Sequence, residues 1–109
     1  MKKFHIAIST NNIAATVQEY SDRLNAQPSL VIPGEYALWR TDTLNISVRH
    51  DQSAATGSLR HLGWEDSNAL QMSANTDING IVWEHFSAEQ QAKEIEEIWS
   101  EVDYQPESV

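Results

Sequence analysis

The chain has 109 residues, a formal charge of −9 and no cysteine. This length fits a single domain over residues 1–109, and the lack of cysteine excludes disulfides, thiolate metal sites and thiol nucleophiles. Seven Lys and Arg against sixteen Asp and Glu oppose contact with a phosphate backbone, so we expect no nucleic-acid partner. No apolar run approaches ~18 residues and no signal for export is visible, so we expect no membrane segment and a cytoplasmic protein.

The first half of the chain predicts the order strand, helix and three strands. Residues 3–8 alternate, which indicates a strand with His5 on the face opposite its apolar side chains. A helix capped at Asn11–Asn12 should follow, because an apolar stripe at helical spacing begins at Ile13, and it should end before Pro28. Three short strands are predicted over residues 30–32, 36–40 and 44–50.

The third of these short strands has one apolar face and one polar face. Asn45, Ser47 and Arg49 share the polar face, because side chains alternate along a strand. Arg49 could anchor an anionic group of a substrate by a charge-assisted contact, or it could lie at a solvated rim. We take these three residues as candidates for substrate binding.

The second half begins with a linker over residues 51–58, rich in small and polar residues. Residues 59–65 predict a strand that repeats the histidine phrase of the first strand and carries His61. A weaker strand over 69–74 and an Asn-Gly turn near 77–80 lead to a strand over 81–86, which carries Glu84 in an apolar run.

The last secondary element is the clearest helix in the sequence. Residues 87–90 form a capping-box pattern, and an apolar stripe continues at helical spacing from Ala88 to about Val102. The acidic residues of this region should form the solvated face of that helix. Residues 104–109 should be a frayed tail.

Two strand histidines and one strand carboxylate, His5, His61 and Glu84, match the donor set of a divalent-metal site. Neutral imidazole and carboxylate oxygen suit Fe, Mn, Co, Ni or Zn, and the sequence does not choose among these metals. The alternative is that these residues are ordinary strand residues that find hydrogen-bond partners. His85 has the opposite parity from Glu84, so we expect it to point away from the site.

Three short motifs stand along the chain: Tyr36-Ala37, Leu44-Asn45-Ile46, and the run Asp77, Gly80, Trp83 and Glu84. In this order they resemble the third-strand phrase, the fourth-strand phrase and the closing-strand signature of the vicinal oxygen chelate superfamily. This superfamily includes glyoxalases, bleomycin resistance proteins and extradiol dioxygenases. The resemblance covers roughly residues 3–86.

This resemblance implies an α+β fold in which paired βαβββ-type modules form a cupped mixed sheet. The first module would occupy residues 1–50 and the second residues 59–86, followed by a C-terminal helix over 87–102. Too few residues separate Glu65 from Asp77 for a helix and two full strands, so the second module should be shortened. The C-terminal helix could cover the surface that the missing helix leaves bare.

The resemblance also implies metal ligands at His5, His61 and Glu84, facing the cup. The leading hypothesis is a metal-dependent dioxygenase, lyase or isomerase that binds a small oxygenated substrate through vicinal oxygens. The alternatives are a non-catalytic module that binds a small molecule, and an interaction domain that presents the apolar stripe of the last helix to another chain. We expect a homodimer, because a shortened module leaves apolar surface uncovered.

No acid-base group is evident from the sequence beside the expected metal ligands. Glu65 shares the parity of His61, but a solvated residue at a strand end is the better interpretation. The four tryptophans should build core and dimer contacts and should not stack on a substrate.

Overall fold

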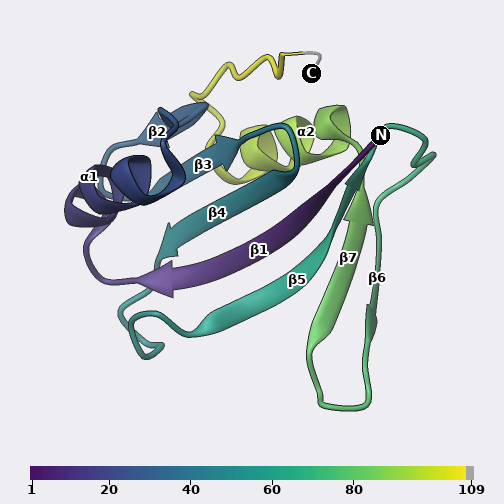
Figure 1. Ribbon diagram of the computed structural model, residues 1–109, viewed down its shortest axis with the longest axis horizontal. Helices are drawn as coiled ribbons and strands as arrows, with labels where there is room; N and C mark the ends of the chain where they lie inside the picture. The colour runs from purple at the N-terminus through teal and green to yellow at the C-terminus, as the bar shows by residue number, and fades with distance from the viewer. Residues whose placement is uncertain (108–109) are drawn as a thin grey trace.

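The computed structural model describes residues 1–107 and shows an α+β fold with one seven-stranded mixed sheet (Figure 1). The elements are β1 (Lys2–Thr10), α1 (Ile13–Leu24), β2 (Leu30–Ile32), β3 (Tyr36–Arg40), β4 (Leu44–His50), β5 (Leu59–Asp66), β6 (Ser73–Thr76), β7 (Val82–Phe86) and α2 (Ala88–Ile98). The strands lie in the order β2-β3-β4-β1-β5-β7-β6. Neither helix of this described part has the length and apolar character needed to cross a membrane.

The sheet consists of two related halves that meet at its centre. In the first half β1 pairs in parallel with β4, and in the second half β5 pairs in parallel with β7. The halves join where β1 pairs antiparallel with β5. Along the chain only β6 separates β5 from β7, whereas α1, β2 and β3 separate β1 from β4. The second half therefore lacks a counterpart of the helix and of one strand of the first half. The predicted cupped sheet of paired modules, with a shortened second module, is confirmed.

Helix α1 packs on the outer face of the first module. The side-chain oxygen of Asn12 accepts a hydrogen bond from the Ala15 N–H at 3.0 Å, which caps the first turn. Asn25 ends the helix with a φ of 51°, in the left-handed region. The apolar stripe of the helix covers a cluster that includes Trp39 and Val48, which are 0% and 1% exposed. The helix predicted to begin at Ile13 and end before Pro28 is confirmed.

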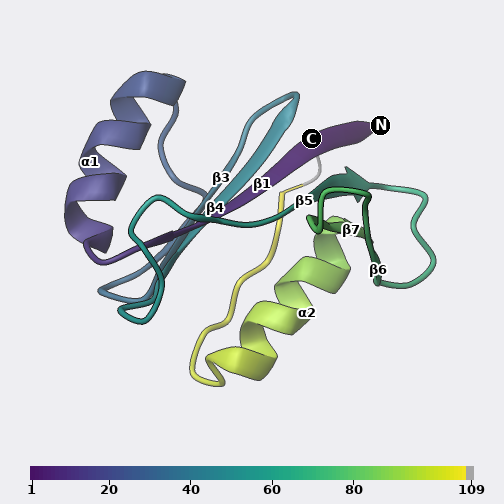
Figure 2. The same cartoon turned by 90° about the horizontal axis from the view of Figure 1, so that it is seen from below.

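Helix α2 packs on the opposite face of the sheet, the inner face of the cup (Figure 2). Ser87 and Gln90 form the predicted capping box, and the helix ends at Ile98, one turn before the expected end at Val102. Ala92 and Ile95 pack against β3 and are buried within the chain itself. The stripe is therefore not a free face for a partner chain.

The position of α2 also corrects the expectation that this helix covers the surface left bare by the helix missing from the second module. The helix missing from the second module would lie on the outer face of the sheet, whereas α2 lies on the inner face. The side chains of Tyr36 and Leu38 point inward from β3 and offer α2 an apolar surface, because alternate residues of a strand face opposite sides. As a consequence α2 covers part of the inner face of the sheet and leaves the outer face of the second module uncovered.

The segment after α2 is packed against the sheet over residues 99–107. Tyr104 is 8% exposed and belongs to the cluster beneath α2, and the Glu107 carbonyl accepts a hydrogen bond from Arg40 at 2.9 Å. The predicted frayed tail is therefore wrong for residues 104–107, and residues 108–109 of that prediction lie outside the described residues. An aromatic side chain that reaches the core explains why the tail is held.

Candidate metal centre

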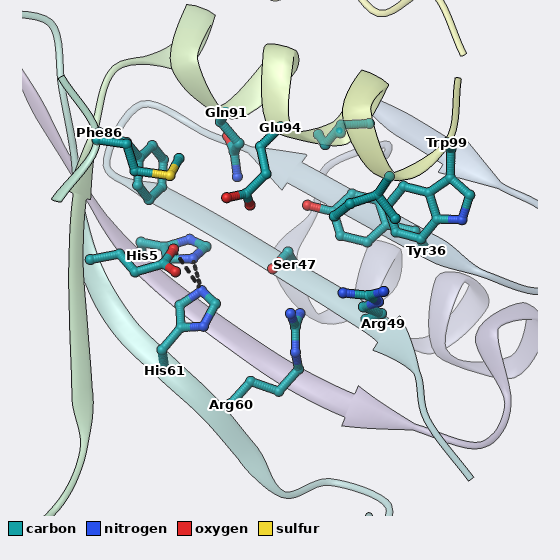
Figure 3. Close-up of a pocket in the computed structure, with 14 residues that line it drawn as sticks. His5, Tyr36, Ser47, Arg49, Arg60, His61, Phe86, Gln91, Glu94 and Trp99 are labelled. Carbon is teal, nitrogen blue, oxygen red and sulfur yellow. Dashed lines mark hydrogen bonds and ion pairs between the residues drawn. The ribbon is translucent and has the colours of Figure 1, made fainter. Parts of the chain in front are cut away.

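Three side chains from three adjacent strands meet on the inner face of the sheet. His5 comes from β1, His61 from β5 and Glu84 from β7, and their donor atoms all lie within 4.8 Å of one another. The two Nε2 atoms of His5 and His61 are 2.9 Å apart (Figure 3). His61 Nε2 also lies 3.0 Å from Glu84 Oε1. The group could hold a metal ion.

The register of the strands explains why these residues meet. His5 pairs with Gly63 across β1 and β5, and Gly63 pairs with Glu84 across β5 and β7. A Cβ on Gly63 would lie 2.2 Å from the Glu84 carbonyl oxygen, so only glycine permits the observed approach of β7. The absence of a side chain at this position thus places the carboxylate beside the two imidazoles.

The tautomer of His5 follows from a buried chain of hydrogen bonds behind it. Arg40 donates two hydrogen bonds of 2.8 Å to the Glu65 carboxylate, which accepts a further one of 2.8 Å from Asn45 Nδ2. The amide oxygen of Asn45 is therefore turned toward His5, where it lies 2.9 Å from Nδ1, and the Asn45 carbonyl oxygen lies at 3.0 Å. Both are acceptors, so Nδ1 carries the proton and the lone pair of Nε2 faces the site.

His61 then faces more acceptors than it has protons. Its Nε2 atom lies against the lone pair of His5 and against the Glu84 carboxylate, yet one ring nitrogen carries at most one proton. A cation shared by the three donors removes this conflict. Two ligand atoms that each lie about 2.1 Å from an ion and subtend a right angle at it are about 3.0 Å apart. This separation is close to the distances from His61 Nε2 to His5 Nε2 and to Glu84 Oε1. The residues therefore fit a divalent ion.

The charge states of these residues favour the same conclusion. Burial lowers the pKa of His5, and the neighbouring His61 lowers it further. Burial alone would raise the pKa of Glu84, but the hydrogen bond and charge of His61 outweigh it and lower this pKa. A neutral imidazole and an ionised carboxylate are the forms that bind metal.

The donor group lies in a small pocket between the sheet and α2, which has a cavity volume of about 30 Å³ and is partly open to solvent. Ser47 and Arg49, two of the three candidate substrate-binding residues, line this pocket. Asn45 does not line it, because this residue is 0% exposed and lies behind His5. Ser47 pairs with Ala7 as Glu84 pairs with Gly63, so Ser47 occupies the place in the first module that Glu84 has in the second.

Arg60 also lines the pocket, although a simple alternation places it on the opposite face from His61. The pairing of β1 with β5 explains this result. Ala7 pairs with His61 and Ile8 with Leu59, so Arg60 is an extra residue in β5, a β-bulge. A bulge redirects side chains locally, and both neighbours then face the pocket. Within one strand no sequence signal reveals such a bulge, because it is a property of the pair.

Helix α2 contributes further polar groups to the pocket that the sequence analysis did not identify. Gln91 and Glu94 line it, and the Glu94 carboxylate points into it (Figure 3). Burial against the pocket walls raises the pKa of Glu94, and the charge of Glu84 adds to this effect. Gln91 lies four residues before Ile95 and Glu94 lies four residues before Ile98, so each shares a helix face with an apolar residue of the pocket, which is the signal that could have indicated them.

Three other expectations about single residues have clear outcomes. Glu65 is 7% exposed, so its interpretation as a solvated residue is wrong, because its carboxylate pairs with Arg40. His85 pairs with Asp66 at 2.8 Å and, as expected, is not part of the donor group. Trp99 is not only a packing residue, because it lines the pocket and its ring lies 5.2 Å from the guanidinium carbon of Arg49.

Comparisons with known proteins show the fold and do not show a family. No protein-family model matches the chain, and no curated protein matches it. The structure is similar to the crystal structure of a hypothetical protein from Staphylococcus aureus, with a TM-score of 0.55 and 10% sequence identity. The similarity covers 77% of this chain and 33% of that one, so the chain spans about a third of the length of that protein.

Proposed function

We propose that the protein is a metal-dependent enzyme of the vicinal oxygen chelate type that acts on a small oxygenated substrate as a dioxygenase, lyase or isomerase. The observation that carries this proposal is the meeting of His5, His61 and Glu84, in which His61 Nε2 faces two acceptors at 2.9 and 3.0 Å. The two-module sheet supports it, because equivalent strands of the two halves supply the two histidines.

In this proposal His5, His61 and Glu84 hold Fe, Mn, Co, Ni or Zn. The ion would act as a Lewis acid toward the oxygens of the substrate. Asn45 keeps the proton of His5 on Nδ1, so that Nε2 stays available as a ligand. Ser47 occupies the place in the first module that is equivalent to Glu84, and its short side chain would leave a coordination position open for a substrate oxygen.

Glu94 is the residue of the pocket best suited to move a proton. Its carboxylate points into the pocket from α2, and its raised pKa increases the fraction that is protonated near neutral pH. Glu84 has a lowered pKa and is the better ligand. We therefore expect Glu94→Gln to leave the metal content unchanged and Glu84→Gln to reduce it.

The second candidate function is the binding of a small molecule without turnover, on the same fold. The apolar part of the pocket wall favours this candidate, because Phe86, Ile95 and Trp99 could hold a hydrophobic ligand. Metal content separates the two candidates, since a resistance-type binding module needs no ion.

The test is elemental mass spectrometry of the protein purified without a histidine tag and reconstituted with each of the five metals. We expect about one ion per chain, and its loss in the His5→Ala, His61→Ala double variant. The control is the double variant at the two histidines outside the donor group, His50→Ala and His85→Ala, which should keep the ion. Protein without any of the five metals after reconstitution would overturn the proposed enzyme and favour the binding module.

A further inference from the structure

We propose that the pocket binds an anionic small molecule whose carboxylate or phosphoryl group lies between Arg49 and Arg60 while its other end faces the metal group. The inference deepens the proposed function and rests on it for the metal-facing end of the ligand. The arginine subsite itself depends only on the arrangement of these two side chains.

The first observation is that these two arginines lack partners. Arg23 pairs with Glu19 at 3.0 Å and Arg40 pairs with Glu65 at 2.8 Å, whereas within residues 1–107 neither Arg49 nor Arg60 forms an ion pair. The chain has more than twice as many acidic as basic residues, so partners are not scarce. Both unpaired guanidinium groups nevertheless line the same pocket as His5 and His61.

The second observation is that the two side chains are half-buried and repel one another. Burial lowers the pKa of Arg60, and the positive charge of Arg49 lowers it further, which shows that the two guanidinium groups interact. Arg49 is held in place by the Trp99 ring, whose centroid is 5.2 Å from its guanidinium carbon. The charges of Glu84 and Glu94 act on Arg60 in the opposite sense, but in the described part of the chain neither carboxylate forms an ion pair with these arginines. An anion between the two guanidinium groups would therefore relieve their repulsion.

The third observation is the β-bulge that brings Arg60 into the pocket. The register of β1 and β5 shifts between Ala7 and Ile8, and Arg60 is the extra residue. A regular pairing would direct its side chain to the outer face, away from Arg49. Figure 3 shows that Arg60 and Arg49 instead extend into the same space between the strands and α2.

The charge of the pocket also favours an anion once a metal is bound. Two arginines and a divalent ion face only Glu84 and Glu94, which leaves an excess of two positive charges. A guanidinium group presents donors in a fork that matches two oxygens of a carboxylate or phosphoryl group. The overall charge of −9 repels anions at long range, so such a ligand must gain its affinity from these local contacts.

The test is calorimetric titration of the Zn(II)-loaded protein, at fixed ionic strength, with glycerate, malate and 3-phosphoglycerate. These probes share a 2-hydroxycarboxylate end and differ at the other end, which is a neutral hydroxyl, a carboxylate or a phosphate. We expect malate or 3-phosphoglycerate to bind about tenfold or more tightly than glycerate, because hydrogen bonds to charged groups are strong. The better of the two identifies the group as a carboxylate or a phosphoryl group.

Arginine variants show which side chains cause the preference for malate or 3-phosphoglycerate over glycerate. It should disappear in the Arg49→Gln, Arg60→Gln double variant, with its zinc content unchanged, and should persist in Arg23→Gln, which removes an arginine of the exposed pair on α1. Thermal unfolding confirms that each variant is folded. Equal binding of the three probes to the wild-type protein, no binding of any probe, or a preference that survives in the double variant would overturn the inference.

The same titrations on metal-free protein separate this inference from the proposed function. A preference for charged probes that depends on Arg49 and Arg60, in protein that takes up no metal, supports the subsite and overturns the enzyme proposal. Normal metal uptake without that preference overturns the subsite alone.

Discussion

His5 donates its Nδ1 proton to Asn45, whose side-chain and backbone oxygens lie 2.9 and 3.0 Å away. Asn45 in turn donates to Glu65, so a buried carboxylate and its arginine determine which nitrogen of a candidate ligand is free. Loss of such a contact behind a ligand typically lowers metal affinity or activity by about ten- to a hundredfold.

Replacing Asn45 with alanine should weaken metal binding while all three ligands remain. The backbone oxygen still accepts from His5, but the side-chain acceptor that orients the ring is lost, so we expect affinity for Zn(II) to fall by about ten- to a hundredfold. Competition against a chromophoric chelator measures the change. Asn75→Ala, on the exposed strand β6, is the control and should bind zinc as the wild type does. Unchanged zinc affinity in folded Asn45→Ala protein would contradict the prediction.

Glu65 should make the stability of the fold dependent on pH. Burial raises its pKa, but the hydrogen bonds from Arg40 and Asn45 outweigh burial and lower it below the usual value of 4.5. A carboxyl whose pKa is lowered on folding stabilises the protein above its unfolded pKa. This contribution is lost as the pH falls through the folded pKa. The free energy of unfolding should therefore decrease below about pH 4.5.

The variant Glu65→Gln tests this assignment by denaturant unfolding. It should lose about 1.5–3 kcal/mol at pH 7, since it removes a charge from buried hydrogen bonds, and it should depend less on pH below 4.5. Glu19→Gln removes a charge from the exposed pair with Arg23 and should change stability by less than about 1 kcal/mol. Equal effects of the two variants would show that the buried pair has no special role.

Replacing Gly63 with alanine should displace Glu84. The new Cβ would lie 2.2 Å from the Glu84 carbonyl oxygen, so β7 must move away from β5. We expect both a lower unfolding temperature and weaker metal binding. Gly34→Ala is the control, because its φ of 75° makes the substitution unfavourable while its Cβ meets no atom within 4 Å. That variant should lose stability and keep its metal, and a Gly63→Ala protein with wild-type metal affinity would argue against the close approach.

The uncovered outer face of the second module should form the contact of a homodimer. Phe4 packs on Trp64 and Trp83 there, with ring centroids 5.2 and 6.1 Å apart, and Trp64 is 39% exposed. Light scattering should give the mass of a dimer for the wild type and of a monomer for Trp64→Glu. Leu70→Glu is the control, because Leu70 is 98% exposed but lies in the loop before β6. A wild-type monomer at micromolar concentration would remove this prediction.

Local sequence patterns predicted most elements of the fold because their information lies within short windows. The stripe that begins at Ile13 and the capping box at Ser87 determine the two helices, whatever these helices pack against. Alternation along each of β1, β5 and β7 gave the parity of His5, His61 and Glu84, and the resemblance to the vicinal oxygen chelate superfamily implied that all three face the cup. The candidate ligands could therefore be named from periodicity and residue chemistry.

The neighbours of these residues could not be predicted in the same way. From the sequence alone Glu65 is predicted to be a solvated residue at a strand end. In the folded chain its carboxylate accepts a hydrogen bond from Arg40, which lies 25 positions earlier. The position of α2 depends on which face of the sheet offers an apolar surface for Ala92 and Ile95. The apolar stripe of the helix does not indicate which face that is. Tyr104 is buried for the same reason, since the sheet beneath it lies far away in the sequence.

The sequence by itself therefore determined the two helices, most strands and the three candidate donor residues, because periodicity and side-chain chemistry act over a few residues. The weak strand expected over 69–74 lies instead at Ser73–Thr76. Only the tertiary structure decided that Arg60 joins Arg49 in the pocket and that Asn45 supports His5. A β-bulge exists only between two paired strands, and a buried hydrogen-bond chain exists only when distant segments exclude water together. These relations belong to pairs of segments, so no single stretch of the chain contains them.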